Sequence, residues 1–264
     1  MRQSSQSVEL PRLTRIMRPV IRHLWQKKYP IEVVSGQEHF EEANDLLNLG
    51  YGMVYMMNHF SLGDTQRGFQ LVLKLEAARK RFIGGPMAHV HRTKLNAFLA
   101  KTAAGIQTYE VVSPYHAKEF IRTHSKAQAK KLGQDYLDQA TQLLLGGGII
   151  GLAPQSTRKP VLGKPKFPVV QSIIDAITPP EKSQRMTSVW PAVFFWCVGL
   201  KIDGIGDYGS TDITQKNKGV TYQARVGKPQ RFQDILKQMS EQAVTADQLI
   251  FSELEDLVPQ AYLG

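Results

Sequence analysis

Short apolar runs that alternate with helix-patterned segments constrain most strongly what this chain can fold into. Such runs are typical of strands that are buried on both faces. We expect strands at Ile31–Val34, Met53–Met57, Phe82–Gly85, Ile106–Val112, Ile149–Ala153, Val189–Val198 and Val220–Val226. We expect helices at Glu41–Leu49, Thr65–Ala78, Arg92–Ala103, Ala127–Leu145, Pro168–Ile177 and Asp247–Leu257. The alternation predicts an α/β fold whose mixed, mostly parallel sheet is flanked by helices.

The length of 264 residues is enough for one large α/β domain with a helical appendage. We therefore expect a basic helical segment over residues 1–30 and an α/β domain over residues 31–264. The single cysteine, Cys197, lies within an apolar run, so it forms no intrachain disulfide and is expected to be a small core residue. This cysteine usage fits a reducing compartment.

The N-terminal segment is strongly basic. Residues 1–30 contain seven Arg and Lys residues and a single acidic residue, Glu9, which gives this segment +6 of the net charge of +10. Apolar residues recur there at the spacing of one helix face, and they are Leu13, Ile16, Met17, Val20, Ile21 and Leu24. The arginines fall largely elsewhere, at Arg12, Arg15, Arg18 and Arg22. This basic amphipathic helix either lies on an anionic membrane surface or packs on the main domain with its basic edge in water, and the two interpretations are compatible.

The charge and hydropathy patterns also limit the partners. The longest apolar stretches, near Leu143–Ala153 and Val189–Leu200, are well short of the roughly 20 residues that span a bilayer. The first residues have no signal-peptide pattern. We expect a cytoplasmic, peripherally membrane-associated protein without a transmembrane helix. No nucleic-acid partner is expected, because the Lys and Arg clusters accompany no recognition motif. The His89 and His91 pair lacks the further ligands that a metal site needs.

The segment after Met53–Met57 carries the clearest chemical signal. Asn58, Ser61 and Asp64 make it densely polar, and His59 lies five positions before Asp64. A strand's carboxyl end that leads into a helix is where open α/β sheets place their reacting groups. There a histidine can act as a general base that a nearby carboxylate holds in place. The alternative is a histidine that only hydrogen-bonds to a helix-capping aspartate.

The pattern Asn58-His59-x-Ser61-x-x-Asp64 resembles the first motif of the glycerolipid acyltransferases, which include the lysophosphatidate and glycerol-3-phosphate acyltransferases. In that family the histidine deprotonates an acceptor hydroxyl, which attacks an acyl thioester, and the aspartate orients the histidine. The segment Pro154–Arg158 resembles the third motif, Pro-Glu-Gly-Thr-Arg, with glutamine and serine at its second and third positions. The resemblance implies that His59 and Asp64 are catalytic and that Asn58, Ser61, Gln155, Ser156, Thr157 and Arg158 bind substrate.

Later segments extend this resemblance over most of the chain from about Ile31 onward. Val189–Phe195 is similar to the fourth motif, an apolar strand with an inner proline. Tyr222–Pro229 and Leu254–Tyr262 are similar to the family's late strand and closing helix. The second motif departs most, because Gly105–Val111 has no arginine at its end. The cation that replaces this arginine is left open among Lys94, Lys101, Arg122 and Lys164.

The resemblance implies an O-acyltransferase of phospholipid synthesis or remodelling. Its donor would be acyl-CoA or acyl carrier protein, its acceptor a lysophospholipid or glycerol phosphate, and it would need no further cofactor. Arg158 would pair with the acceptor phosphate, since a guanidinium binds phosphate through two parallel hydrogen bonds. Two alternatives remain open. One is a catalytically degenerate protein of the same fold that binds a lipid or membrane surface, and the other is a hydrolase in which water replaces the alcohol at His59.

Overall fold

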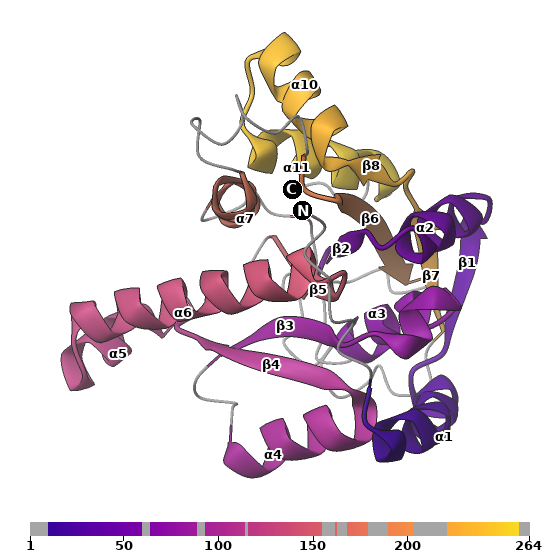
Figure 1. Cartoon of the computed structure of the whole chain (residues 1–264), viewed down its shortest axis with the longest axis horizontal. Coiled ribbons are helices and arrows are strands. Elements are labelled where there is room, and N and C mark those ends of the chain that lie inside the picture. Colours follow the sequence, from indigo (N-terminus) through magenta and orange to yellow (C-terminus); the bar gives the residue numbers. More distant parts are fainter. Residues whose placement is uncertain are drawn as a thin grey trace, which may run out of the picture.

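The computed structural model describes residues 10–59, 64–88, 93–113, 116–154, 162, 168–178, 190–202 and 221–258. Within them it confirms the predicted α/β fold, a mixed, mostly parallel sheet flanked by helices (Figure 1). The strands are β1 (Ile31–Ser35), β2 (Gly52–Met57), β3 (Ile83–Ala88), β4 (Ile106–Val111), β5 (Ile149–Leu152), β6 (Val193–Ile202), β7 (Tyr222–Val226) and β8 (Gln230–Arg231). The helices are α1 (Arg12–Lys28), α2 (His39–Asn48), α3 (Asp64–Val72), α4 (Lys94–Leu99), α5 (Ala117–Thr123), α6 (Lys126–Leu145), α7 (Val169–Ile177), α10 (Phe232–Gln242) and α11 (Ala246–Leu257), with short helical turns η1 (Ala77–Lys80) and η3 (Ala100–Ala104).

Strand β2 lies at the centre of the sheet. The strand order is β1-β7-β6-β2-β5-β3-β4, and β8 pairs with β6. Strands β6, β5, β3 and β4 run parallel to β2, whereas β7 is antiparallel to β6 and β1 is parallel to β7. Every residue of β2 is buried, which explains its continuous apolar run. In Figure 1 α6 lies on one side of β3 and β4 and α4 lies on the other.

Helix α3 ends at Val72, six residues before the predicted end. Its last turn tightens, because the amides of Lys74 and Leu75 donate to carbonyls three residues back. Arg79 Nε then donates to the Leu73 carbonyl at 3.0 Å. Leu73 and Leu75 remain buried in this turn, so the apolar pattern continues after the helix has ended. Helices α5 and α10 were not predicted, and each buries only one or two of its side chains.

Helix α1 packs on the domain through a buried arginine. Arg18 is 3% exposed, and its guanidinium donates to five backbone carbonyls, those of Ala78, Arg79, Arg81, Ala104 and Gly105, at 2.8–3.3 Å. Burial lowers the pKa of Arg18 to about 10, so the side chain stays charged at neutral pH.

Further contacts hold α1 in this position on the domain. Thr14 Oγ1 donates to the Thr102 carbonyl at 2.7 Å, and Trp25 packs edge-on against Phe69. Gly105 has a φ of +67°, and a Cβ there would overlap the Arg18 guanidinium. The packing face of α1 is therefore the side that carries Thr14 and Arg18, and Arg18 is not exposed to any outer surface.

Among the helices that the structure describes, none combines the length and the apolar character needed to cross a bilayer.

Candidate active site

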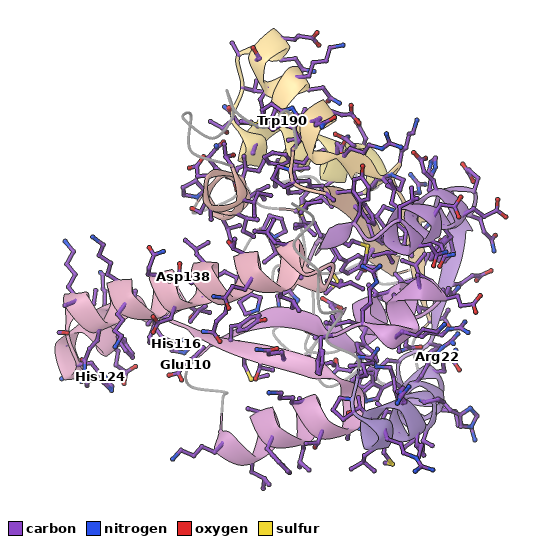
Figure 2. The ribbon with its side chains drawn as sticks, viewed as in Figure 1. Arg22, Glu110, His116, His124, Asp138 and Trp190 are labelled. Atoms are coloured by element: carbon purple, nitrogen blue, oxygen red, sulfur yellow. The ribbon has the colours of Figure 1, made fainter. Side chains whose placement is uncertain are left out.

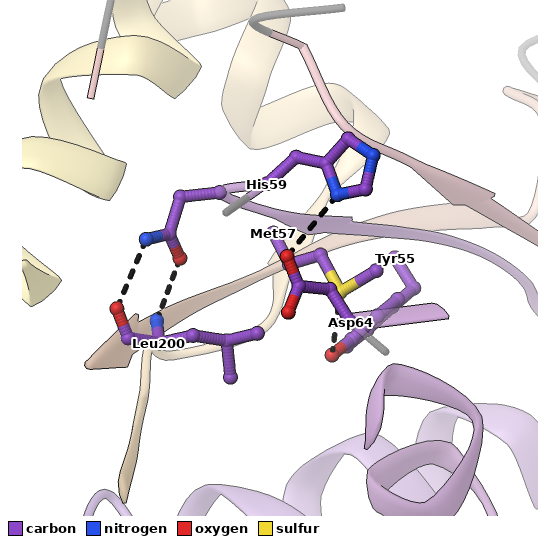
Figure 3. Close-up of polar contacts among 6 residues, drawn as sticks. Tyr55, Met57, His59, Asp64 and Leu200 are labelled. Carbon is purple, nitrogen blue, oxygen red and sulfur yellow. Dashed lines mark hydrogen bonds and ion pairs between the residues drawn. The ribbon is translucent and has the colours of Figure 1, made fainter. Parts of the chain in front are cut away.

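The carboxyl end of β2 and the first residue of α3 bring the predicted pair together. His59 Nδ1 and Asp64 Oδ2 are 3.1 Å apart (Figure 3). The Asp64 side chain is fully buried, whereas 22% of the His59 side chain is exposed. Carboxylate oxygens accept hydrogen bonds, so this contact favours the tautomer in which Nδ1 carries the hydrogen and Nε2 has the lone pair. Figure 3 shows Nε2 on the side of the ring that is turned away from Asp64. This arrangement suits a general base.

Asn58 fixes the backbone that carries His59. Its side chain is fully buried and makes two hydrogen bonds with the backbone of Leu200. Asn58 Nδ2 donates to the Leu200 carbonyl at 2.9 Å, and the Leu200 amide donates to Asn58 Oδ1 at 2.6 Å. The main-chain pairing of β2 with β6 runs as far as Met57 and Val198. The Asn58 amide therefore continues that pairing beyond the end of the strand. In this structure the side chain predicted to bind substrate is engaged with Leu200.

A glycine of α3 lies against two side chains of β2. Gly68 lies one helical turn after Asp64 and faces the strand. A Cβ at this position would lie 2.8 Å from Met57 Sδ and 3.0 Å from Tyr55 Cε1. Real Cβ atoms essentially never sit that close, so a larger residue at position 68 would require the Met57 and Tyr55 side chains to shift.

Two further side chains surround the Asp64 carboxylate. The Tyr55 hydroxyl lies 3.8 Å from Met57 Sδ, and burial, with the charge of Asp64, raises the pKa of Tyr55. Arg67 is fully buried, with its guanidinium carbon 3.4 Å from the centre of the Tyr222 ring. Burial lowers the pKa of Arg67, while Tyr222, Asp64 and Tyr29 act in the opposite direction. Arg67 was not among the predicted site residues, although its spacing of three residues from Asp64 on one helix places the two side chains on neighbouring positions.

Strand β5, the neighbour of β2 in the sheet, ends at the same edge as the His59–Asp64 pair. Strand β5 pairs in parallel with β2, with Leu152 opposite Met56, so Ala153 and Pro154 leave the same edge of the sheet as His59. Ser61 and the segment 155–158 lie outside the described residues. The predicted substrate-binding roles of Ser61, Gln155, Ser156, Thr157 and Arg158 therefore stay predictions.

Other described histidines have settings that differ from that of His59. His116 Nδ1 lies 2.8 Å from Ser113 Oγ, and His124 stacks on Phe120 with ring centres 4.3 Å apart. Figure 2 places His124 at the outer end of α5 and α6, and His116 further in, near the labels of Glu110 and Asp138. His39 lies 3.6 Å from Glu38 on the surface. In the part of the chain that the structure describes, no three His, Cys, Asp or Glu side chains are grouped as metal ligands, and His89 and His91 lie outside it.

Two of the cations considered for the second motif lie together in an open pocket. Lys94, Phe98 and Lys101 line it from α4 and η3, and Gln107 and Thr108 line it from the edge strand β4. Its volume is about 300 Å³. Of the other two, Arg122 lies on α5 and Lys164 lies outside the described residues.

Comparison of the sequence with known protein-family models gives no match, and comparison with curated proteins gives none either.

Proposed function

We propose that this protein is an O-acyltransferase of phospholipid synthesis or remodelling. It moves a fatty acyl group from acyl-CoA or acyl carrier protein to a hydroxyl of a lysophospholipid that resembles 1-acylglycerol-3-phosphate. One observation carries the proposal: a partly exposed imidazole is held by a fully buried carboxylate at the end of the central strand. The order of the motifs downstream supports the choice of an acyl thioester and a phosphorylated acceptor.

The dyad supplies the proton transfers that acyl transfer needs. His59 Nε2 takes the proton of the acceptor hydroxyl as its oxygen attacks the thioester carbonyl, and a C–O bond forms. Asp64 holds the ring through Nδ1 and stabilises the imidazolium. When the tetrahedral intermediate collapses, the C–S bond breaks, and the imidazolium returns the proton to the departing thiolate. A base in this position typically contributes about 10²–10⁴-fold to the rate.

Neighbouring groups complete the proposed site. Asn58 positions His59 through Leu200, and Arg67 provides positive charge near the buried Asp64 carboxylate. The parallel pairing of β2 with β5 supports a role for residues 155–158, because the two strand ends are neighbours. Arg158 is our candidate for the acceptor phosphate. Hydroxyl or backbone donors of the same segment are candidates for the oxyanion.

We further propose that the protein works at the cytoplasmic surface of a membrane. A lysophospholipid acceptor is anchored in the bilayer by its acyl chain, so the enzyme must meet it there. A second candidate function is binding to a lipid surface without turnover. It is favoured by the apolar side chains that α1 and α4 expose to solvent.

The decisive experiment follows thiol release from long-chain acyl-CoA with a panel of acceptors: lysophosphatidate, glycerol 3-phosphate and neutral lysophospholipids. We expect the parent protein to form the acylated acceptor and His59→Ala to lose about 10²–10⁴-fold of the rate. His39→Ala is the matched control, since His39 also pairs with a carboxylate, but that of Glu38 is 72% exposed; its rate should equal that of the parent.

Each alternative has its own outcome. Transfer by His59→Ala at the parent rate would reject the catalytic assignment. Release of free fatty acid without any acceptor would identify a hydrolase. Vesicle binding by a parent protein that turns over no thioester would favour the lipid-surface protein.

A further inference from the structure

Large exposed apolar side chains are concentrated on two helices. On α1 these are Leu13, Ile16, Val20 and Leu24, which are 50–60% exposed. On α4 they are Leu95, Phe98 and Leu99, which are 51–68% exposed. Elsewhere in the described chain the large exposed apolar side chains belong to separate elements, as is ordinary for a protein surface; they are Val34, Leu49, Ile121, Leu145 and Trp190. A concentration of this kind marks an interaction surface.

The two helices are neighbours in space. Helix α4 continues directly into η3, and η3 contacts α1. The contact is made by Thr14, which donates to the Thr102 carbonyl, and by Arg18, which donates to the carbonyls of Ala104 and Gly105. Figure 1 shows α1 and α4 at the same end of the molecule, at the bottom of the view.

The Arg18 anchor prevents the apolar row of α1 from turning inward. Thr14 and Arg18 are buried on the packing side, with Ile21 and Trp25 packed against the core beside them. At 3.6 residues per turn, the row from Leu13 to Leu24 lies roughly a third of a turn or more away from that side. Rotating the helix to bury the row would pull a charged guanidinium off five carbonyls.

The charged residues of α1, α4 and η3 are all basic. Neither residues 12–28 nor residues 94–104 contain Asp or Glu. Exposed basic side chains accompany both apolar rows, and they are Arg12, Arg15, Lys27, Lys28, Lys94 and Lys101. Lys94 and Lys101 also line the open pocket beside Phe98. Apolar side chains ringed by cations fit the boundary between anionic headgroups and acyl chains.

We propose that α1 and α4 together form the surface by which this protein docks on an anionic phospholipid bilayer. The apolar rows enter the headgroup and acyl boundary, the lysines and arginines meet lipid phosphates, and the Lys94–Lys101 pocket receives an anionic headgroup. The inference deepens the proposed function and rests on it for its purpose, because it names the surface that brings the active site to a bilayer.

The test is co-sedimentation of the full chain with vesicles of phosphatidylcholine, with and without phosphatidylglycerol. The parent should bind the anionic vesicles, and added salt should weaken the binding. The double variant Ile16→Glu/Phe98→Glu should bind about tenfold or more weakly. Lys94→Glu/Lys101→Glu should lose about tenfold on anionic vesicles only. The matched control is Leu49→Glu, because Leu49 is 72% exposed but lies on neither helix; it should bind like the parent.

Further readouts keep this inference separate from the proposed chemistry. His59→Ala should bind vesicles normally, and Ile16→Glu/Phe98→Glu should still acylate water-soluble glycerol 3-phosphate. The surface is wrong if the double variant binds as well as the parent, or if Leu49→Glu weakens binding equally. A parent dimer that Ile16→Glu/Phe98→Glu converts to a monomer would also overturn it, since a second copy would then cover the surface.

Discussion

Arg18 and Asp64 are both charged side chains with almost no exposed surface, yet they lie in very different surroundings. Arg18 is 3% exposed and bonds to backbone carbonyls of η1, η3 and the residues after them. Asp64 is fully buried and bonds to His59, a titratable side chain that still reaches solvent. The first arrangement holds two parts of the fold together. The second connects the interior to a group that can exchange protons with a substrate.

The partners of a buried charged side chain therefore indicate its role. A cation whose partners are backbone carbonyls has partners that do not titrate, so its environment is constant. A carboxylate whose partner is an imidazole can orient the ring and offset the positive charge that the ring gains when it accepts a proton. Removing the charge should therefore affect stability in the first region and catalysis in the second.

The largest effect is expected from Asp64→Asn. Asparagine keeps the shape of the side chain but offers no full negative charge to the imidazolium, and its amide can favour the wrong tautomer. We expect kcat for acyl transfer to fall by about 10³-fold, equivalent to roughly 4 kcal/mol in the barrier. Steady-state kinetics measures this, and circular dichroism checks that the chain stays folded. Normal turnover by the variant would place Asp64 with Arg18, among structural charges.

The next largest effect is expected from Arg18→Met, which keeps the aliphatic stem but removes every donor. The buried carbonyls lose their partners, so we expect the free energy of unfolding to fall by about 2–4 kcal/mol. Denaturant unfolding measures the loss. Arg12→Met is the matched control on the same helix; because Arg12 is exposed, its change should stay within about 0.5 kcal/mol. Equal losses for the two variants would contradict the anchor.

The smallest effect concerns Glu253, a third charged group, which lies on α11 against Cys197 of β6. Burial raises the pKa of Glu253 from 4.5 to about 7, so the folded chain holds a proton there that the unfolded chain releases earlier. Its contribution to stability is complete below about pH 4.5 and is lost as the pH rises toward 7. We expect Glu253→Gln to remove about 1–2 kcal/mol of this pH dependence, discounted for partial exposure.

Thermal unfolding between pH 4.5 and pH 7.5 measures the Glu253 effect. Glu255→Gln, an exposed neighbour on α11, serves as the control. An unchanged pH profile in Glu253→Gln would show that the Glu253 carboxyl has the same pKa in the folded and the unfolded chain.

The elements of the fold that sequence reasoning predicted well are those whose signal is local. Met53–Met57 and Ile149–Leu152 are strands because both faces are buried, and a continuous apolar run records that directly. The His59–Asp64 contact was also predictable, since a strand end and a helix start that are only five positions apart must lie close together. The early end of α3 was not predictable, because Leu73 and Leu75 stay buried in the turn that follows.

The features that sequence reasoning missed depend on distant partners. Arginine is rarely buried, and the carbonyls that hold Arg18 lie 60–87 positions further along the chain. The hydrogen bonds of Asn58 to Leu200 were not predictable, because a partner 142 positions away cannot be identified from local spacing. The apolar row of α1 predicted a face without saying whether that face meets the domain or the solvent. The buried position of Arg18, which only the structure shows, places the apolar row in the solvent.

The hydrogen bonds between Asn58 and Leu200 also have a consequence for the order in which the site assembles during folding. The two residues are 142 positions apart, and they meet only after a long crossover connection has closed. Contacts of such high sequence separation form late, because loop closure costs entropy before the contact stabilises anything. A chain that has formed β2 and α3 but has not yet docked β6 therefore lacks the two Asn58–Leu200 hydrogen bonds that hold the backbone before His59. The geometry of the proposed site is then complete only once β6 has joined the sheet.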